Sequence, residues 1–279
     1  MSQTTTSGAS AMASNLKNEN TLRIKLTMIG KVGIFSIASL LLISCQNSSG
    51  GFERGDFSGW FREFPKEYSG QIVTSPVRCG KYAARFEIRS GDRFWMGGNR
   101  TEIHEYFAKA PFHKEVWYGF STFVPNDWPD LENRTVISQW HATPDKGEAY
   151  RSPPLAIRYI GGQLRVTGIT SNKQIQKMND GRWLSLYNDR GRWKKGGWND
   201  WIFQVIWSWE QDGMVKAWLN DTQVIDYQGP IGYRDDAGPW FKMGIYRDDH
   251  DVPQILFHDE YRKGASFAEV NPSHCDRKK

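Results

Sequence analysis

The amino-acid sequence predicts an all-β protein, a two-sheet β-sandwich of the jelly-roll kind. Short runs that alternate apolar and polar residues recur along residues 52–275, and Gly, Pro, Asn and Asp separate them. No part of this range shows the apolar spacing of a long helix, and no internal repeat is visible. Many short strands at regular spacing favour such a sandwich.

The predicted strands follow one another with short connections. Gly161-Gly162 marks a hairpin, and two further turns, at 211–213 and at Asn220-Asp221, divide the region that follows residue 200 into three strands. In chain order, the expected strands occupy residues 82–90, 99–105, 115–125, 135–141, 154–169 (as a hairpin), 200–210, 213–227 (as a hairpin), 240–247 and 254–264.

The composition is that of a soluble globular chain, with 39% apolar and 24% charged residues among 279. Aromatic residues reach 14% and include thirteen Trp. Large aromatic side chains can fill a sandwich core, or they can form platforms on which sugar rings stack. The abundance of Trp is compatible with both interpretations.

An export signal is expected before this domain. Residues 32–43 form an apolar run of twelve after Lys31, which is shorter than the roughly 20 residues that span a bilayer and suits a secretory signal. The run ends at Ser44-Cys45 and resembles the bacterial lipobox, which implies that Cys45 carries lipid. The expected parts are an export signal at 1–44, a flexible tether at 45–51 and one large domain at 52–275.

The same resemblance predicts an exported bacterial lipoprotein. Gln46, rather than Asp, follows the cysteine, and this favours the outer membrane. An ordinary signal peptide and a buried strand are the alternatives, and Met28 is a second candidate for the start of the chain. After Cys45 only Cys79 and Cys275 remain, and an even pair in an exported protein predicts a disulfide, with two free buried thiols as the alternative.

Overall charge gives little guidance on partners. The net charge is +5, but residues 1–44 hold four basic residues and one acidic residue, so the rest of the chain has a net charge of +2. Residues 180–198 concentrate Arg and Lys among aromatic residues and Gly. We expect Arg192 and Lys194 in this stretch to hold a polyanion, with a solvated loop as the alternative. We expect no nucleic-acid partner, because an exported lipoprotein seldom meets nucleic acid as a substrate, and we expect a monomer.

Metal ions and organic cofactors have no clear signature in this sequence. The six His are scattered, and neither H-x-H nor H-E-x-x-H occurs. We therefore expect neither a catalytic metal nor an organic cofactor. A structural Ca²⁺ site built from Asp and backbone oxygens stays open.

Two of the predicted strands place unusual polar side chains on one face. Side chains alternate along a strand, so Arg100, Glu102 and His104 share a face of "NRTEIHE". A cross-strand ion pair on a solvated face would explain the first two equally well. In "VISQWH" the alternation places Ile137, Gln139 and His141 on one face, and Val136, Ser138 and Trp140 on the other.

A third strand, "WFKMGIYR", separates an apolar face from a reactive one. Lys242, Gly244 and Tyr246 alternate with three apolar residues, and Gly244 leaves room for a ligand to approach the backbone. Taken alone, His141 could be a structural histidine and Tyr246 could cap the edge of the core. The three strands together favour a functional cleft.

These strands resemble those of a known family. "RTEIHE", "ISQWH" and "FKMGIYR" are similar to the three signature strands of jelly-roll polysaccharide lyases, whose sandwich is concanavalin A-like. Alginate lyases of this fold carry R-[ST]-E-L, Q-[IV]-H and Y-F-K-A-G-[IV]-Y. The forms here resemble more closely the heparin lyase I group and the glucuronan lyases, to which residues 51–60 and 198–221 are also similar. Ile103-His104 and Trp140 depart from the alginate-lyase pattern.

The resemblance implies cleavage of a uronate chain by β-elimination. Such an enzyme must neutralise the uronate carboxylate, remove the C5 proton and protonate the oxygen leaving C4. Gln139 and Arg100 suit the carboxylate, because amide and guanidinium donors can reach both of its oxygens. Tyr246 and His141 are the candidates for proton transfer. Tyrosine is a weak base at its ordinary pKa of about 10, and neighbouring cations such as Lys242 and Arg100 favour phenolate.

The stereochemistry of the substrate decides how the two proton-transfer groups divide the work. Where C5–H and C4–O lie on the same side, as in glucuronate or mannuronate, Tyr246 could act as both base and acid. Where they lie on opposite sides, as in guluronate or iduronate, His141 would take the proton and Tyr246 would donate one. The further residues expected to contact substrate are Glu102, His104, Trp140 and Arg247, although alternation directs Trp140 towards the core.

The expected function is an endo-acting lyase of an anionic polysaccharide, with glucuronan first and alginate, a heparin-like chain or ulvan as other substrates. A non-catalytic carbohydrate-binding sandwich is the main alternative, and it would not need this set of polar residues. A glycoside hydrolase needs two carboxylates that flank one bond. Glu102 and Glu105 point to opposite faces of their strand, which argues against it.

Overall fold

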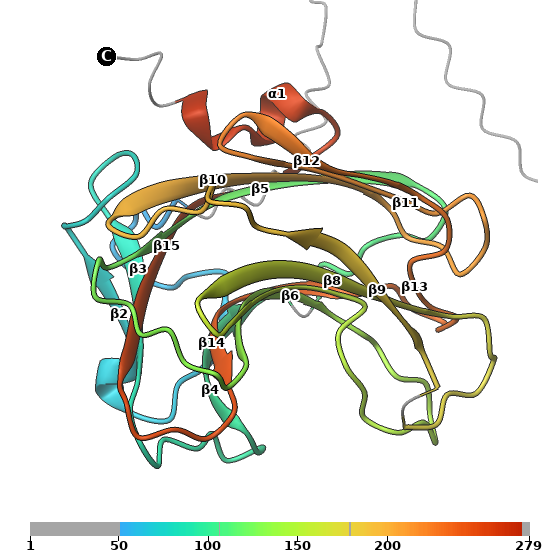
Figure 1. The fold of residues 1–279 in the computed structure, drawn as a ribbon, viewed down its shortest axis with the longest axis horizontal. Helices are drawn as coiled ribbons and strands as arrows, with labels where there is room; N and C mark the ends of the chain where they lie inside the picture. The colour runs from blue at the N-terminus through green and yellow to red at the C-terminus, as the bar shows by residue number, and fades with distance from the viewer. Residues whose placement is uncertain (1–50, 106, 179, 275–279) are drawn as a thin grey trace, which may run out of the picture. The chain divides into compact units, whose positions relative to one another are not determined.

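The computed structural model describes residues 51–105, 107–178 and 180–274, which belong to one compact unit. Two β-sheets lie face to face (Figure 1), and every strand pairing is antiparallel except that of β13 with β8. The predicted jelly-roll sandwich is therefore confirmed. The predicted export signal, the lipidation site Cys45 and Cys275 lie outside the described residues.

The first sheet has eight strands and carries the three strands singled out by their polar residues. It arches in Figure 1, and loops at its two ends project to the same side. Its order is β1 (Phe61–Glu63), β4 (Asn99–His104), β14 (Trp240–Arg247), β6 (Thr135–His141), β7 (Leu155–Ile160), β8 (Gln163–Ser171) and β13 (Gly232–Tyr233), with β9 (Arg182–Asn188) also paired to β8.

The second sheet has seven strands and covers the inner face of the first. A short helix, α1 (Phe267–Val270), lies on its outer side, where Val270 packs with Trp117 and Ile202. The order is β12 (Thr222–Gln228), β11 (Met214–Leu219), β10 (Gly197–Ile206), β5 (Glu115–Val124), β15 (Gln254–Gly264), β3 (Ala83–Ile88) and β2 (Gly70–Val73), and the helical turn η1 (Glu67–Ser69) precedes β2.

Alternation of apolar residues located the long strands but missed four others. β1, β2 and β13 span two to four residues, and β9 lies in the stretch expected to be a basic loop. These strands bury few apolar side chains, so they leave little periodic signal. The predicted hairpins are confirmed, because β7 continues into β8 through Gly161-Gly162 and β11 into β12 through Asn220-Asp221. Both residues of the second turn have positive φ, as a tight hairpin turn requires.

Aromatic side chains from both sheets fill the core. Trp140 and Phe241 come from the eight-stranded sheet and meet Phe203 and Phe120 of the other, with ring centroids 4.8 Å (Trp140–Phe203) and 5.1 Å (Phe120–Phe241) apart. Burial of each such ring contributes a few kcal/mol of hydrophobic free energy. Part of the Trp content is thus explained by packing, whereas Trp183 is 55% exposed and stays available for a ligand.

Two further features concern export and membranes. Cys79 is disulfide-bonded, and its predicted partner, Cys275, lies outside the described residues. None of the helices in the described part of the chain has the length and apolarity needed to cross a bilayer.

Candidate active site

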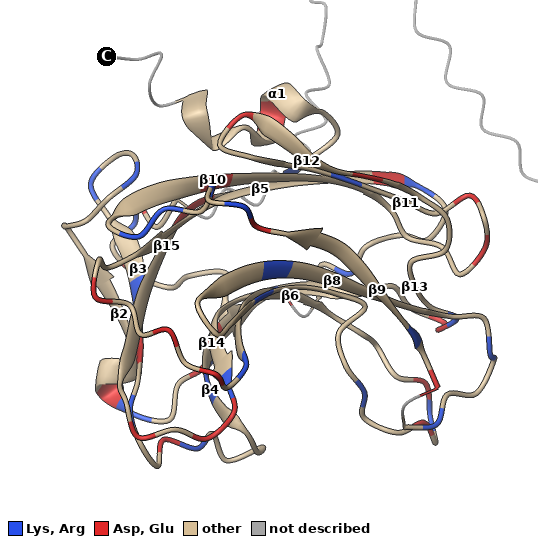
Figure 2. Ribbon diagram, viewed as in Figure 1, with Lys and Arg blue, Asp and Glu red and all other residues tan. Residues whose placement is uncertain are grey.

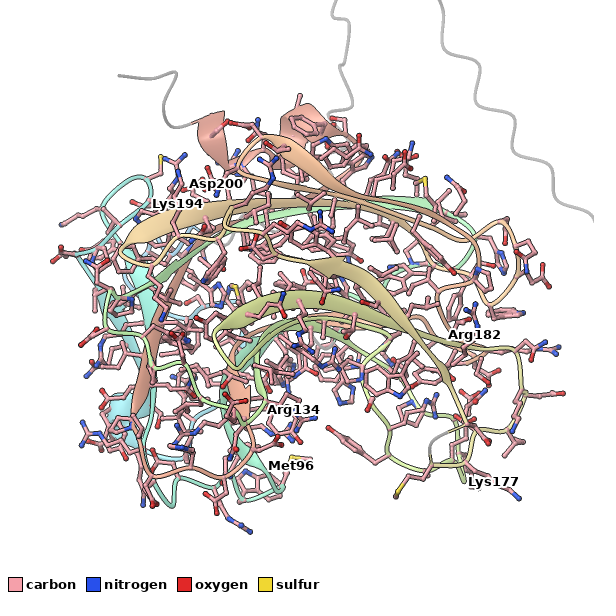
Figure 3. The ribbon with its side chains drawn as sticks, in the orientation of Figure 1. Met96, Arg134, Lys177, Arg182, Lys194 and Asp200 are labelled. Atoms are coloured by element: carbon pink, nitrogen blue, oxygen red, sulfur yellow. The ribbon has the colours of Figure 1, made fainter. Side chains whose placement is uncertain are left out.

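A pocket of about 260 Å³ opens on the outer face of the eight-stranded sheet. Figure 3 shows Arg134 on one side of this face, close to Met96, and Lys177 on the other side. Lys and Arg also interrupt the strands of this sheet, as Figure 2 shows. The lining of the pocket includes Arg134, Gln139, His141, Tyr150, Trp183 and Tyr246.

Strand register brings the predicted site residues together. β14 lies between β4 and β6, so Tyr246 pairs with Arg100, and Lys242 pairs with His104 on one side and Gln139 on the other. These residues are far apart in sequence, yet all reach the face that carries the pocket. The sequence could predict the face of each strand, and the sheet order supplies their proximity.

Beneath the pocket, Lys242 is buried between two carboxylates. Its Nζ lies 2.6 Å from Glu63 Oε2 and 2.9 Å from Glu102 Oε2, and its side chain is 1% exposed. Gln139 Nε2 donates a hydrogen bond to Glu102 Oε1 at 2.5 Å, so one further amide N–H is left for a ligand. Burial raises the pKa of Glu102, but the charges of Lys242 and Arg100 and the hydrogen bonds from Lys242 and Gln139 together lower it more, and the net shift is downward. Glu102 is therefore an anion that holds Lys242 and Gln139 in place.

Tyr246 stands between two arginines. The guanidinium carbons of Arg100 and Arg134 lie 4.5 Å and 5.1 Å from the centroid of its ring. Gly98, at φ +80°, lies so close that a Cβ there would come within 2.9 Å of both Arg100 and Tyr246. Tyr246 also lines the pocket. It is the phenol best placed to meet a substrate proton.

His141 is held in one tautomer. Its Nδ1 lies 2.7 Å from the carbonyl oxygen of Ala142 and its Nε2 lies 2.8 Å from the Tyr150 hydroxyl. Since a carbonyl only accepts, Nδ1 carries the hydrogen and Nε2 accepts from Tyr150. Burial, followed by the Lys242 charge, lowers the pKa of His141 to about 3. The imidazole is therefore neutral at neutral pH, with its Nε2 lone pair facing Tyr150.

The loop between β6 and β7 positions Tyr150. Arg151, which is 7% exposed, forms ion pairs with Glu148 at 2.9 Å and with Asp235. The Tyr233 hydroxyl donates to the Ser152 carbonyl at 3.0 Å. Burial alone would lower the pKa of Arg100, but the Glu102 charge and the Tyr150 hydroxyl raise it above its ordinary value. Tyr150 thus belongs to the electrostatic environment of both His141 and Arg100.

Histidine 104 lies at the β1 edge of this face. Its ring stacks on Phe61 with centroids 5.2 Å apart, and its Nε2 lies 3.6 Å from Glu63 Oε1. Burial, followed by the Lys242 charge, nevertheless lowers the pKa of His104 to about 4. At neutral pH the contact with Glu63 is thus one with a neutral imidazole.

Two sequence predictions about substrate contacts are wrong. Trp140 is 0% exposed, because alternation turns it into the core against Phe241. Arg247 is 3% exposed and donates to the carbonyl oxygens of Val252 and His250, so its guanidinium holds the loop after β14.

β-Bulges explain two other differences from simple alternation. A register shift between Val136 and Ser138 turns Ile137 into the core instead of towards Gln139. Gly244, at φ +135°, lies at a second irregularity, and a Cβ there would come within 2.2 Å of the Thr101 carbonyl oxygen. The glycine is thus needed for close approach of β4, and not for approach of a ligand as predicted.

The basic stretch at 180–198 lies apart from this pocket. Arg192 lines a separate groove and donates to Thr222 of the second sheet at 3.1 Å. The backbone N–H of Lys194 donates to Asn199 of β10 at 2.9 Å, and Lys194 lies on the opposite side of the unit from Arg134 in Figure 3. The structure does not bring these two residues to the other candidate site residues.

Three residues of the site were missed by sequence reasoning. Glu63 lies on β1, whose three residues give almost no periodic signal, although Phe61 and Glu63 do share a face. Arg134 directly precedes β6, and its ion pair with Asp248 at 2.6 Å depends on the fold. Tyr150 lies in a loop, where alternation predicts nothing. Of the three, only Tyr150 brings a group able to transfer a proton to the pocket lining.

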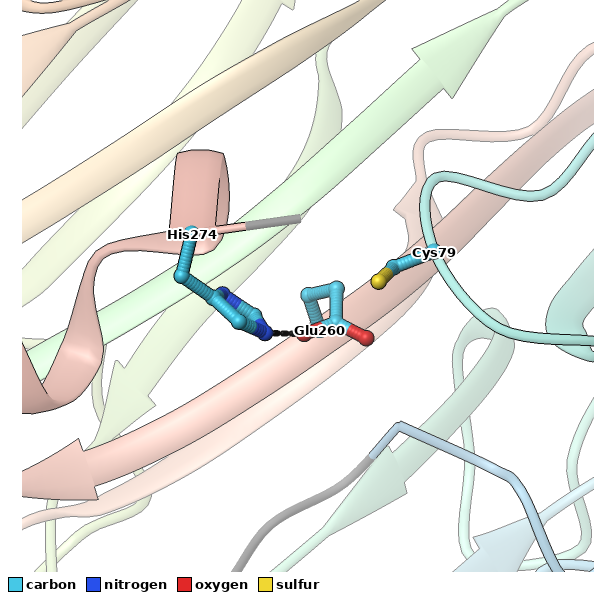
Figure 4. A group of neighbouring side chains, drawn as sticks. All are labelled: Cys79, Glu260 and His274. Atoms are coloured by element: carbon cyan, nitrogen blue, oxygen red, sulfur yellow. Dashed lines mark ion pairs between the residues drawn. The ribbon is translucent and has the colours of Figure 1, made fainter. Parts of the chain in front are cut away.

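Three groups of side chains in the described residues have the proximity needed to hold a metal ion. In one of them, shown in Figure 4, Glu260 pairs with His274 at 3.3 Å, but the sulfur of Cys79 belongs to a disulfide and is no thiolate ligand. A second group, Asp145, Glu148 and Asp235, is engaged by Arg151 and by backbone N–H groups. The third, His113, Glu210 and Asp212, is exposed.

Comparisons with known proteins agree on one fold. A family model described as polysaccharide lyase matches residues 52–262. An endo-β-1,4-glucuronan lyase from Trichoderma reesei superposes with a TM-score of 0.65 at 19% identity, covering 78% of this chain and 96% of that one. Alginate lyase A1-II′ in complex with substrate gives 0.52 at 13% identity, covering 78% and 97%. An alginate lyase from Pseudomonas aeruginosa gives 0.50 at 16% identity, covering 76% and 100%. No curated protein sequence matches.

Proposed function

Because the chain belongs to the polysaccharide lyase family, we propose that it cleaves a uronate-containing polysaccharide by β-elimination at the pocket of the eight-stranded sheet. The observation that carries this proposal is the position of Tyr246. Tyr246 lines the pocket together with Gln139 and His141, and Arg100 and Arg134 lie over its ring.

The electrostatic demand of the reaction is met by donors around Tyr246. The C5 proton becomes acidic only when the uronate carboxylate is neutralised and the developing enediolate is stabilised. Gln139 keeps one amide N–H beyond its bond to Glu102, and Arg100 supplies a fixed positive charge. Their own positions are set by Glu102 and Glu63, so little reorganisation is needed when substrate binds.

Tyr246 carries the proton transfers in this proposal. Its phenolate oxygen removes the C5 proton, the C4–O bond breaks as the C4=C5 double bond forms, and the hydroxyl so formed gives the proton to the leaving oxygen, which regenerates the phenolate. The guanidinium groups of Arg100 and Arg134 stabilise negative charge on the phenolic oxygen during this exchange. A single tyrosine suffices where C5–H and C4–O lie on the same side, as in glucuronate.

We propose glucuronan as the first substrate to test. The likeness in fold to the fungal glucuronan lyase supports this choice. His141 is neutral and hydrogen-bonded to Tyr150, so in the same-side reaction its role is to orient Tyr150 and the sugar. On guluronate or iduronate, the same Nε2 atom would instead accept the C5 proton.

The cellular context and the absence of a cofactor are proposals from the sequence. We propose that Cys45 is lipidated and anchors the enzyme in the outer membrane, and that catalysis by a monomer needs no metal or organic cofactor. A Cys45→Ala variant expressed in a Gram-negative host would then leave the membrane fraction. Persistence of this variant in the membrane would contradict the anchor.

The decisive assay follows the ultraviolet absorbance of the unsaturated product. Glucuronan, alginate, heparin, hyaluronan and ulvan are incubated in turn with the protein, and a neutral β-glucan serves as the control. We expect a rise on glucuronan and none on the neutral polymer. No rise on any uronate polymer would overturn the proposal. New reducing ends without absorbance would indicate hydrolysis, which the burial of Glu102 and its ion pair with Lys242 argue against.

A further inference from the structure

Arg158 is a buried cation without a carboxylate partner. It lies on β7, is 3% exposed, and donates through Nη1 to the Thr167 hydroxyl. Its Nη2 has no hydrogen-bond partner, and no carboxylate of the described residues forms an ion pair with it. The other buried cations on this face are paired, since Lys242 has Glu63 and Glu102, and Arg151 has Glu148 and Asp235.

An unpaired buried charge is costly, and arginine can hardly escape the cost by losing its proton. Burial of an ion without a partner costs several kcal/mol, and guanidinium stays protonated across the physiological range. Burial and the neighbouring Arg134 charge lower the pKa of Arg158 to about 10, which still leaves it charged at neutral pH. The fold therefore keeps a destabilising cation that a bound anion would compensate.

Arg158 lies beside the proposed reaction centre. Tyr246 pairs with Val136, and Val136 pairs with Arg158 across the next strand. Two strand spacings separate the backbones by roughly 10 Å. Arg134 links the positions, because it lies over the Tyr246 ring and also acts on Arg158.

An aromatic surface covers this cation and lines the same pocket. The guanidinium of Arg158 lies 5.3 Å from the centroid of the Trp183 ring. Trp183 is 55% exposed and, with Tyr233 and Arg134, lines the pocket that contains Tyr246. A half-exposed indole beside an unpaired guanidinium offers a flat face for a sugar ring and a planar fork for its carboxylate.

We propose that Arg158, Arg134 and Trp183 form a second subsite, which binds the carboxylate of a uronate residue next to the one that is cleaved. This inference rests on the proposed function for the identity of its ligand. Nη2 of Arg158 is unpartnered but covered in this structure. In the proposed complex the half-exposed indole of Trp183 shifts to stack on the sugar ring, and the carboxylate of that sugar accepts from the Nη2 that this shift uncovers. Because this subsite is remote from the bond that breaks, it raises the affinity for the polymer and leaves the rate of the chemical step unchanged.

Steady-state kinetics on polyglucuronate test the subsite. We expect Arg158→Met to raise KM by about tenfold to a hundredfold, as loss of a hydrogen bond to a charged group does, with kcat within about twofold of the wild type. Arg158→Lys, which keeps the charge but loses the fork, should fall between the two. Lys216→Met removes one positive charge from the outer face of β11 in the other sheet and should leave KM unchanged.

Stability separates a binding role from a structural one. Loss of an unpaired buried cation should leave the melting temperature of Arg158→Met equal to that of the wild type or higher. An unchanged KM, or a lower melting temperature with a parallel fall in kcat, would overturn the subsite.

A binding measurement keeps this test apart from that of the reaction. In a Tyr246→Phe background, the affinity for polyglucuronate should fall on Arg158→Met, while the weak affinity for a neutral β-glucan should not change. If the wild type cleaves no uronate polymer but this difference persists, the lyase proposal fails and the subsite stands. If the wild type is active and Arg158→Met binds equally well, the subsite alone fails.

Discussion

The two halves of the pocket-bearing face balance their charges in different ways. In the half formed by β1, β4 and β14, the cations Lys242 and Arg100 face the carboxylates of Glu63 and Glu102. In the half formed by β7, β8 and β9, Arg158 and Arg165 form no ion pair with a carboxylate of the described residues; the first bonds to a hydroxyl and the second to an amide oxygen.

This difference indicates two roles: the paired charges keep the reaction site preorganised, and the unpaired charges attract the anionic polymer. A closed set of paired charges keeps its geometry whether or not a ligand is present, which suits the place where the bond is cleaved. Unpaired buried cations destabilise the ligand-free protein, and a bound anion offsets that cost. Such cations therefore suit a site that binds a polyanion. Tyr246 lies on β14, at the boundary of the paired half, in register with Arg100 on one side and two strands from Arg158 on the other.

The largest effect should come from a change of Tyr246, at the boundary of the two halves. Tyr246→Phe removes the hydroxyl that we assign to both proton transfers, so kcat should fall by about a thousandfold. Both charged halves stay intact, and the affinity for polyglucuronate should therefore change little. The measurement is initial-rate ultraviolet absorbance together with calorimetric binding.

Tyr227→Phe is the matched control for this change. Tyr227 lies on β12, in the other sheet, and its hydroxyl donates to the Pro230 carbonyl. We expect wild-type rates for this variant. An active Tyr246→Phe variant would show that another residue transfers the proton.

The next largest effect should distinguish the paired half from the unpaired one by stability. Lys242→Met leaves the carboxylates of Glu63 and Glu102 with Arg100 as their remaining cation, at 3.4 Å and 4.0 Å, which should lower the free energy of unfolding by about 3 kcal/mol. Combining it with Glu102→Gln removes one of these charges and should restore part of the loss. Denaturant midpoints of Lys242→Met and Arg158→Met would be compared directly. If both variants lost the same free energy of unfolding, the proposed distinction between the halves would be wrong.

Acid should lower the stability of the fold through two neutral histidines, His104 on β4 and His141 on β6. Burial lowers the pKa of His104 to about 4 and that of His141 to about 3, against about 6.5 in the unfolded chain. The unfolded state therefore binds more protons than the native state as pH falls below 6.5, and stability declines towards pH 4. At pH 5.5 each histidine should cost about 1.4 kcal/mol relative to pH 7.5.

The control for this prediction is a change of one histidine. His104→Gln should make the decline of the unfolding free energy between pH 7.5 and pH 5.5 shallower by about one such contribution. If the wild type and this variant lost stability in parallel, His104 would not be the neutral group described here.

Period-two alternation could predict most of the face, because it depends only on local geometry. Arg100, Gln139 and Tyr246 could be assigned to one surface from their strands alone. Alternation failed at Ile137, where a bulge in β6 shifts the pattern by one residue. It was also silent on Tyr150, since loop side chains have no fixed period.

Charge balance was the other quantity that the sequence could not supply. Arg158 and Lys242 both lie on strands among apolar residues, and nothing local distinguishes the paired from the unpaired cation. Glu63 decides the matter by pairing with Lys242 across β4. Such contacts join residues separated by well over a hundred positions, so they emerge only when the order of strands is known.

The smallest effect is expected at Tyr150, on the loop that joins the two halves. Its hydroxyl donates to His141 on β6, while its neighbour Arg151 is anchored to Asp235, which follows β13 beside β8. Tyr150→Phe removes one neutral hydrogen bond, worth about 1 kcal/mol, so kcat/KM on glucuronan should fall about fivefold. If Tyr150 were instead the base, the loss would approach that of Tyr246→Phe. Measuring both variants on glucuronan and on a guluronate-rich alginate separates these roles, because only an opposite-side elimination would draw a proton towards His141.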